Sequence, residues 1–230
     1  MEIPIVKNPD ILDELLSNYR SAFPEIRQFR HFSELISALN ISGKRSVAHL
    51  NSIVSDHVNQ SNMNRFLESK FDMETIFRKT IDLINSIEKD GILAIDDTIV
   101  EKTGKHMEGA SWIFDHSVGK NVFGMQLATC TFSGKYGFYP ISADIYRRLE
   151  SLEKEKKEEE YITKIEMQIQ TIGKCISAGL NFHTVVGDIW YFTKDINSFA
   201  FLLKIEGVCS SIYYKHRGSI LGTTSICSSS

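Results

Sequence analysis

The chain has 230 residues, 42% of them hydrophobic and 24% charged, which is typical of a globular protein with enough apolar material for a core. Its four cysteines form no C-x-x-C pair, which excludes the usual zinc-binding pattern, and no apolar run approaches the roughly 18 residues of a membrane span. The formal net charge of −3 argues against nucleic-acid binding through an overall positive charge but leaves local basic patches open. Because the start shows no signal-peptide pattern, we expect a cytoplasmic protein that does not enter a membrane.

Residues 1–89 show the amphipathic spacing of helices and not the alternation of strands. The apolar residues of the segment 11–23 recur at helical intervals until Pro24 ends the pattern. Ser46 stands where a helix N-cap is expected, because a serine hydroxyl can accept a hydrogen bond from the first turn. Further helices are predicted at 31–39, 46–58, 62–70 and 73–89. This part of the chain is therefore predicted to be an all-helical N-terminal unit.

The pattern changes to β-strands at Gly91. The stretch GILAIDDT is predicted to be a buried strand that ends in two adjacent carboxylates, Asp96 and Asp97, followed by a polar loop up to Lys120. A hairpin turn is predicted at Ser133-Gly134. The other elements are predicted at 121–132 (strand), 135–148 (strand), 149–179 (a charged run that continues as a helix), 180–192 (strand), 197–205 (helix) and 208–217 (strand), before a low-complexity tail.

This order of elements predicts an α/β domain with a mixed sheet flanked by helices. A helix between two strands requires a crossover, so the strands on either side of it pair in parallel. Asp188 is expected at the end of one central strand, as Asp96 and Asp97 are at the end of its neighbour. The acids should therefore meet at the carboxyl ends of the strands, where ligands bind in open α/β sheets.

Two carboxylates brought together in this way repel one another unless a cation lies between them. Mg²⁺ takes one or two protein carboxylates, keeps water ligands and leaves room for phosphate oxygens. Two such ions can activate a water molecule and stabilise the leaving oxygen of a phosphodiester. From the residues alone, metal-dependent phosphoryl transfer and a second interpretation are equally favoured. In the second interpretation, Asp96, Asp97 and Asp188 only cap turns at strand ends.

Two segments carry a resemblance to a known family. IDDTIVEKTGKHMEGA resembles the first-Asp strand, and GDIWYF the second-Asp strand, of the DDE-type transposases of bacterial and archaeal insertion sequences. The upstream HFSELISALNISGKRSVAHL is similar to the helical region that precedes the catalytic domain in that family. The likeness runs from about His31 to Arg217. It implies an RNase H-like catalytic domain in residues 90–230, preceded by a helical DNA-binding region in residues 1–89.

The resemblance also implies an activity and a set of site residues. The enzyme would cleave and join DNA at element ends with Mg²⁺ or Mn²⁺ in a two-metal site. Asp97, directly before Thr98, is the expected first metal ligand, Asp96 is the alternative because neighbours on a strand point to opposite faces, and Asp188 is the expected second ligand. Apart from the resemblance, basic residues just past the first acidic strand and after the last strand are expected either to contact DNA phosphates or to be ordinary solvated loop charges: Lys102, Lys105, His106, Lys215 and Arg217.

One part of the family pattern has no match. The family has a third acid, a glutamate on a helix after the last core strand, and the sequence has no counterpart of it. We therefore expect the N-terminal portion of a transposase, shortened and inactive if the third ligand is essential. A non-catalytic DNA-binding or inhibitory fragment is the alternative, and homodimerisation is left open.

Overall fold

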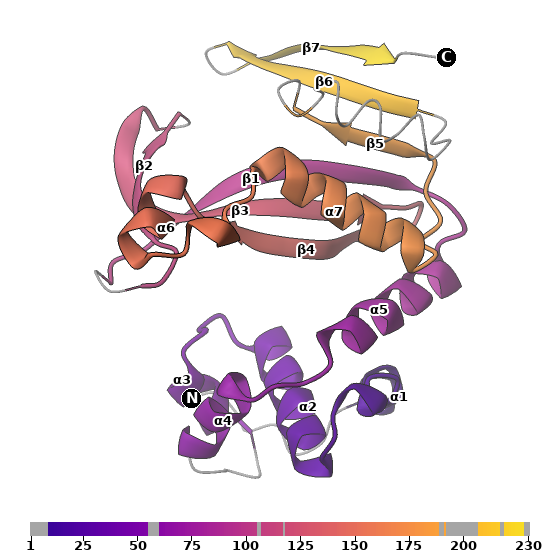
Figure 1. The fold of residues 1–230 in the computed structure, drawn as a ribbon. Coiled ribbons are helices and arrows are strands. Elements are labelled where there is room, and N and C mark those ends of the chain that lie inside the picture. The colour runs from indigo at the N-terminus through magenta and orange to yellow at the C-terminus, as the bar shows by residue number, and fades with distance from the viewer. Residues whose placement is uncertain are drawn as a thin grey trace. The chain divides into compact units, whose positions relative to one another are not determined.

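The computed structural model describes residues 9–54, 60–104, 107–116, 118–188, 191, 207–216 and 219–227, the last two ranges by their backbone alone. The chain divides into two compact units, Met1–Thr80 and Ile81–Ser230 (Figure 1). No helix in the described ranges has both the length and the apolar character needed to cross a membrane.

The first unit is helical, as predicted. Its elements are α1 (Asp10–Ser17), the 3-10 turn η1 (Arg20–Ala22), α2 (Ile26–Ile41), α3 (Val47–Ser52), α4 (Gln60–Glu68) and the beginning of α5 (Met73–Ile87). The predicted cap is confirmed, because the Ser46 hydroxyl accepts a hydrogen bond from the backbone N–H of His49 at 3.4 Å. The core of this unit is aromatic. Phe23 is buried and its ring contacts those of Phe32 and Phe66.

The second unit is built on a seven-stranded mixed sheet. Its strands are β1 (Ile92–Glu101), β2 (Ser111–Asp115), β3 (Lys120–Ser133), β4 (Phe138–Tyr146), β5 (Thr184–Gly187), β6 (Gly207–His216) and β7 (Ser219–Cys227). Strand β3 is antiparallel to β1, β2 and β4, whereas β5 is parallel to both β1 and β6. The order β4-β3-β1-β5-β6 with these directions is that of the RNase H-like fold, so the predicted fold class is confirmed.

Helix α7 (Lys164–Ser177) provides the crossover from β4 to β5, after the short α6 (Leu149–Glu155) and the 3-10 turn η2 (Glu158–Glu160). It lies along one face of the sheet, over β3 and β4 (Figure 1). A capping box between Thr163 and Glu166 starts the helix, and Gly179 follows it with a φ of +78° that suits glycine. The second predicted helix, 197–205, lies outside the described residues.

Four details of the predicted sheet were wrong. The strand expected at 180–192 is β5 at Thr184–Gly187 alone among the described residues of that range. The stretch expected as a loop contains β2, whose sequence SWIFD pairs with β3 and places Trp112 opposite Phe123. The tail, for which no strand was predicted, contains β7, which pairs with β6. Strand β1 does not end at the acids but continues to Glu101, because β3 is 14 residues long and pairs with β1 from Ile92 onward.

The buried carboxylate of Glu88 fastens the segment after α5 to the β3–β4 hairpin. Glu88 is 1% exposed and accepts hydrogen bonds from the backbone N–H groups of Lys135 (2.9 Å) and Tyr136 (2.7 Å). The Tyr139 hydroxyl donates a third bond at 3.0 Å. Burial alone would raise the pKa of Glu88, but the hydrogen bonds to its carboxylate outweigh it and the pKa is lowered.

Replacing Glu88 by glutamine is expected to lower the melting temperature at pH 7 by about 5 °C or more. The glutamine amide would place an N–H group next to backbone N–H groups, so that one of these donors would lose its hydrogen-bond acceptor. The pKa of Glu88 in the folded state lies below its ordinary value of 4.5. The ionised carboxylate therefore stabilises the fold above pH 4.5, and this stabilisation is lost as the pH falls through the folded-state pKa. Thermal melts at pH 7 and pH 3 should show the gap between wild type and variant narrowing at pH 3.

The matched control for this substitution is Glu153→Gln, at an exposed position of α6. It should leave the melting temperature unchanged at both pH values. A gap between wild type and Glu88→Gln that stays constant with pH would contradict the role given to the ionised carboxylate.

Candidate active site

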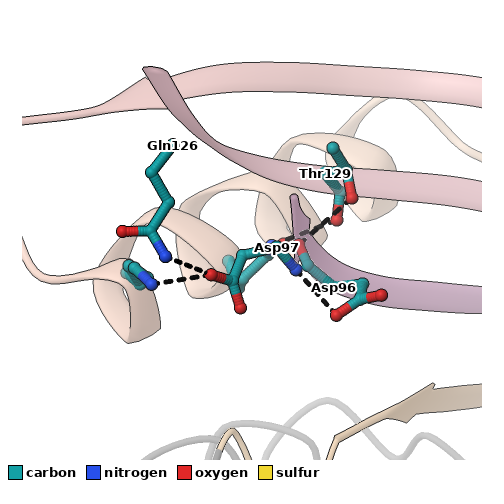
Figure 2. Close-up of polar contacts among 6 residues, drawn as sticks. Asp96, Asp97, Gln126 and Thr129 are labelled. Carbon is teal, nitrogen blue, oxygen red and sulfur yellow. Dashed lines mark hydrogen bonds and ion pairs between the residues drawn. The ribbon is translucent and has the colours of Figure 1, made fainter. Parts of the chain in front are cut away.

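The two adjacent aspartates lie in the middle of β1. Asp96 is paired with Thr129 and Asp97 with Ala128 on β3, and the pairing continues beyond them to Glu101. Their expected position at the end of the strand was therefore wrong, and so was the interpretation of these two acids as caps of a strand-end turn. Neighbouring residues on a strand point to opposite faces of the sheet, and the two carboxylates accordingly point away from each other (Figure 2).

The carboxylate of Asp97 is held by an ion pair. Its Oδ2 lies 2.7 Å from the Nζ of Lys164, the first residue of α7, and accepts a hydrogen bond from Gln126 on β3. The side chains of Asp97 and Lys164 are only 17% and 16% exposed. The Lys164 ammonium also lies 5.2 Å from the centre of the Tyr146 ring. Asp97 thus faces α7, with its charge already balanced.

The carboxylate of Asp96 has no such counter-charge in the described contacts. It is accessible to solvent, and its Oδ1 accepts a hydrogen bond from the backbone N–H of Asp97 at 2.8 Å. Partial desolvation raises the pKa of Asp96, and the negative charges of Asp97 and Asp188 raise it further, against the opposing effect of the Asp97 N–H. A nearby cation would relieve this repulsion.

Asp188 follows directly after β5 and is exposed. Because Ile95 on β1 is paired in parallel with Gly187 on β5, the next residues along the two strands, Asp96 and Asp188, are neighbours. Glycine is needed at position 187, since a Cβ there would lie 2.8 Å from Cγ1 of Ile95 and 2.9 Å from its carbonyl oxygen. The structure therefore brings Asp188 beside Asp96, whereas Asp97 points to the opposite face.

Side chains from β3 and α7 fix the backbone at Asp96. The carbonyl oxygen of Asp96 accepts hydrogen bonds from the Thr129 hydroxyl at 3.1 Å and from the Gln168 amide at 3.4 Å. The buried Gln168 amide also donates to the carbonyl of Thr129 at 3.1 Å. The residue that presents the exposed carboxylate is thus tied to two neighbouring elements, which suits a ligand that must keep its position.

The donors at this site fit a hard divalent cation. In the part of the chain that the structure describes, no three His, Cys, Asp or Glu side chains lie close enough together to hold one metal ion. Two exposed carboxylates, Asp96 and Asp188, directly follow the paired residues Ile95 and Gly187 of neighbouring strands. This is the number that Mg²⁺ ordinarily takes from a protein while it keeps water ligands and binds substrate phosphates.

Comparison with known families agrees with this chemistry. Residues 21–197 match the sequence profile of a family described as DDE superfamily endonuclease. The chain belongs to this family. The resemblance drawn from the sequence motifs is thereby confirmed, and DDE superfamily endonucleases use divalent metal ions.

Two individual proteins are similar to this chain. A protein of Microchaete diplosiphon, described as "probable transposase for insertion sequence element IS701", is 27% identical over 194 residues. That match covers 82% of this chain and 50% of the relative, so the chain spans about half the relative's length. The solved Drosophila P element transposase strand transfer complex is 17% identical, with a TM-score of 0.36, over 84% of this chain and 43% of that one. A TM-score this low adds nothing to the assignment of the fold.

The five basic residues predicted to contact DNA are only partly within the described structure. Lys102 follows β1, is half-buried, and donates its backbone N–H to the carbonyl of Phe123 at 2.8 Å. Five residues of extended chain separate it from Asp97, a distance of about 17 Å. Lys215 lies on β6, where the backbone alone is described. Lys105, His106 and Arg217 lie outside the described residues.

Sequence reasoning missed the residues that surround the acids. Lys164, Gln126 and Gln168 were not singled out, although Lys164 and Gln126 contact the carboxylate of Asp97 and Gln168 donates to the backbone carbonyl of Asp96. One signal was available. Thr163 and Glu166 form a capping-box pattern that marks Lys164 as the start of a helix after β4. It did not indicate which strand residue Lys164 would face.

Proposed function

We propose that this DDE endonuclease is a DNA transposase, which cuts phosphodiester bonds at the ends of an insertion element and joins those ends to target DNA. The observation that supports the proposal is the pairing of Ile95 with Gly187, which makes the next residues, Asp96 and Asp188, neighbours at parallel strands of an RNase H-like sheet. Membership of the DDE superfamily supports it, as does the similarity to a protein described as a transposase of an insertion element.

Within this proposal the contacts favour Asp96 over Asp97 as the first metal ligand. A cation at Asp97 would have to displace Lys164 from an ion pair that is mostly buried, and the displaced ammonium would lose its partner. Asp96 is exposed and lies beside Asp188, and its pKa is raised mainly by partial desolvation and then by the charges of Asp97 and Asp188. We therefore assign the metal to Asp96 and Asp188, in place of the sequence-based preference for Asp97 and Asp188.

The proposed cofactor is Mg²⁺ or Mn²⁺, as a pair of ions. When bound, divalent ions would activate the attacking water or 3′-hydroxyl and stabilise the leaving oxygen of the phosphodiester. Attack at phosphorus forms one P–O bond and breaks another, and the proton of the nucleophile goes to solvent. The chain itself contributes the two carboxylates of Asp96 and Asp188, of which Asp96 is held in position by hydrogen bonds from Thr129 and Gln168 to its backbone carbonyl.

The proposed partner is DNA, bound through its phosphates. We assign this contact to Lys102, Lys105, His106, Lys215 and Arg217, together with the helical region 1–89. Basic side chains that bind phosphates raise the affinity for DNA without distinguishing its sequence. Removing them should therefore weaken binding to all DNA sequences alike and reduce the salt dependence of binding.

A nicking assay on supercoiled plasmid tests the proposed activity. The 230-residue chain is incubated with plasmid in Mn²⁺, in Mg²⁺ and in EDTA, and Asp188→Asn is treated in parallel. We expect nicking with either ion, none in EDTA, and a loss of about 10³-fold in the variant, since a metal ligand supplies several kcal/mol. Plasmid binding without nicking at any metal concentration would contradict the enzymatic proposal, and so would equal nicking by Asp188→Asn.

A further inference from the structure

A pocket of about 460 Å³ lies beside β2, and neither Asp96 nor Asp188 lines it. Strands β1 and β2 both pair with Gly124 of β3, so they lie on opposite edges of β3, and β2 shares its edge with β4. The pocket is lined by the start of β2, by the residues that follow β4 and by α6 (Figure 1). Its volume is within the range of about 300–1,000 Å³ that is usual for ligand sites.

One side of the pocket is aromatic. Trp112 on β2 lines it and is 67% exposed, and Phe123 of β3 lies beside it. The two rings meet edge to face, with 5.7 Å between their centres. This contact covers at most one face of the indole, so the other face can stack on a planar group. The exposed tryptophan therefore suits a flat aromatic ligand better than a compact ion.

The charged side of the pocket is held in place by Arg147, which follows β4 and whose side chain is 17% exposed. Its guanidinium forms ion pairs with Glu108 at 3.7 Å, Glu155 at 2.5 Å and Glu160 at 3.6 Å. Glu108 precedes β2, whereas Glu155 is the last residue of α6, so these pairs join two of the elements that form the pocket. The pocket thus exists before a ligand binds, which lowers the cost of ordering on binding.

The other polar side chains that line the pocket carry both signs of charge: Arg148, Glu150, Ser151 and Lys154. Among the ion pairs of the described residues, none involves Arg148 or Lys154. A nucleobase matches such a set, because its edge presents hydrogen-bond donors and acceptors together. The phosphates on either side of the base match the two cations. A phosphate alone would also meet the carboxylate of Glu150, so a whole nucleotide is the better fit.

Trp112 projects from the same face of the sheet as Asp96. Asp96 pairs with Thr129 on β3, and Trp112 pairs with Phe123 on the same strand. Paired residues share a face, and six positions separate Thr129 from Phe123 (129 minus 123), an even number that keeps both side chains on one face. The distance along β3 is about 20 Å. A DNA strand with one phosphate at Asp96 can therefore reach Trp112 without crossing the sheet.

We infer that this pocket binds an unpaired base of the DNA strand that runs past Asp96, stacked on Trp112, with Arg148 and Lys154 on the neighbouring phosphates. Stacking accepts every base, so the pocket binds single-stranded DNA without selecting its sequence. A base within a duplex cannot enter, because its neighbours already cover both of its faces. The inference rests on the proposed function, which supplies DNA as the ligand, and adds to it a nucleotide site remote from the metal.

Trp112→Ala tests the inference in a binding assay that needs neither metal nor cleavage. A short fluorescein-labelled oligothymidine is titrated with the 230-residue chain in EDTA, and the affinity is measured by fluorescence anisotropy. We expect Trp112→Ala to weaken binding about tenfold, the usual effect of losing one stacked base. Trp112→Phe keeps an aromatic ring and should stay within about threefold of the wild type. Binding of a labelled duplex should change by less than about twofold in both variants, because paired bases do not reach the indole.

The matched control is Phe114→Ala. Phe114 is also aromatic, is 46% exposed and lies two positions further along β2 on the same face, but it does not line the pocket. Its replacement should leave the affinity for the oligothymidine as in the wild type. An equal loss for Phe114→Ala would overturn the inference, and so would a loss below about twofold for Trp112→Ala. A wild-type chain that does not bind the oligothymidine would overturn it as well.

Thymidine monophosphate distinguishes a site for DNA from a site for free nucleotides. The mononucleotide lacks the neighbouring phosphates, so we expect it to displace the oligothymidine only in large excess. Displacement at equal concentrations would overturn the assignment to DNA.

The plasmid assay reports separately on the proposed function. A wild-type chain that binds the oligothymidine through Trp112 but nicks no plasmid would refute the enzymatic activity and keep the pocket. A chain that nicks plasmid and binds the oligothymidine independently of Trp112 would keep the activity and refute the pocket.

Discussion

Asparagine at position 96 is expected to abolish metal-dependent DNA nicking, whereas asparagine at position 97 should reduce it only in part. Asp96→Asn removes an exposed carboxylate beside Asp188, and the loss of a metal ligand costs about 10³-fold in rate. Asp97→Asn leaves that carboxylate in place and disturbs only the ion pair behind it. We expect a loss of about tenfold, together with a lower melting temperature.

Nicking rates and Mn²⁺ affinities of the two variants, measured side by side, decide between the two aspartates. The controls are far-ultraviolet circular dichroism and melting curves, which show whether each variant is folded at the assay temperature. The reverse order, with Asp97→Asn inactive but folded and Asp96→Asn active, would restore the sequence-based assignment of Asp97.

Replacing Lys164 by methionine is expected to destabilise the second unit by about 2–3 kcal/mol. The change removes the cation from a pair that is mostly buried and leaves Asp97 with its hydrogen bond from the Gln126 amide but without its counter-charge. Breaking a buried pair from one side is costly because the remaining charge stays desolvated. Chemical denaturation of the wild type and the variant measures this free energy of unfolding.

A double-mutant cycle tests whether the cost belongs to the ion pair. Once Lys164 is methionine, changing Asp97 to asparagine should restore stability, because no uncompensated charge remains. We expect the double variant to be more stable than Lys164→Met alone. Strictly additive losses would show that Lys164 stabilises the fold through packing on Tyr146 and not through Asp97.

The general architecture could be predicted because its signals are local. Periodicity placed the helices, Ser46 marked a cap, and the order of strands and helices limited the sheet to parallel pairing around the crossover. The hairpin at Ser133-Gly134 was also found correctly, since β3 ends at Ser133 and β4 begins at Phe138. These features depend on residues close together in the chain.

The errors arose where pairing over long distances decides the outcome. Strand β2 is a short aromatic run between glycine-containing turns, and it becomes a strand because the long β3 extends far enough to pair with it. Because β3 is so long, β1 also stays paired with it beyond Asp97, as far as Glu101. Lys164 lies 67 positions from Asp97, and the periodicity of α7 does not disclose which strand residue its ammonium will meet.

The mid-strand position of the two aspartates has a consequence for how the sequence of β1 can change. Side chains alternate between the two faces, so an insertion or deletion of one residue between Ile92 and Asp96 would exchange the faces of both acids. The carboxylate that we assign to the cation would then turn inward onto Lys164, and its neighbour would be exposed in its place. The proposed metal site therefore depends on the exact length of this segment as well as on its two acids.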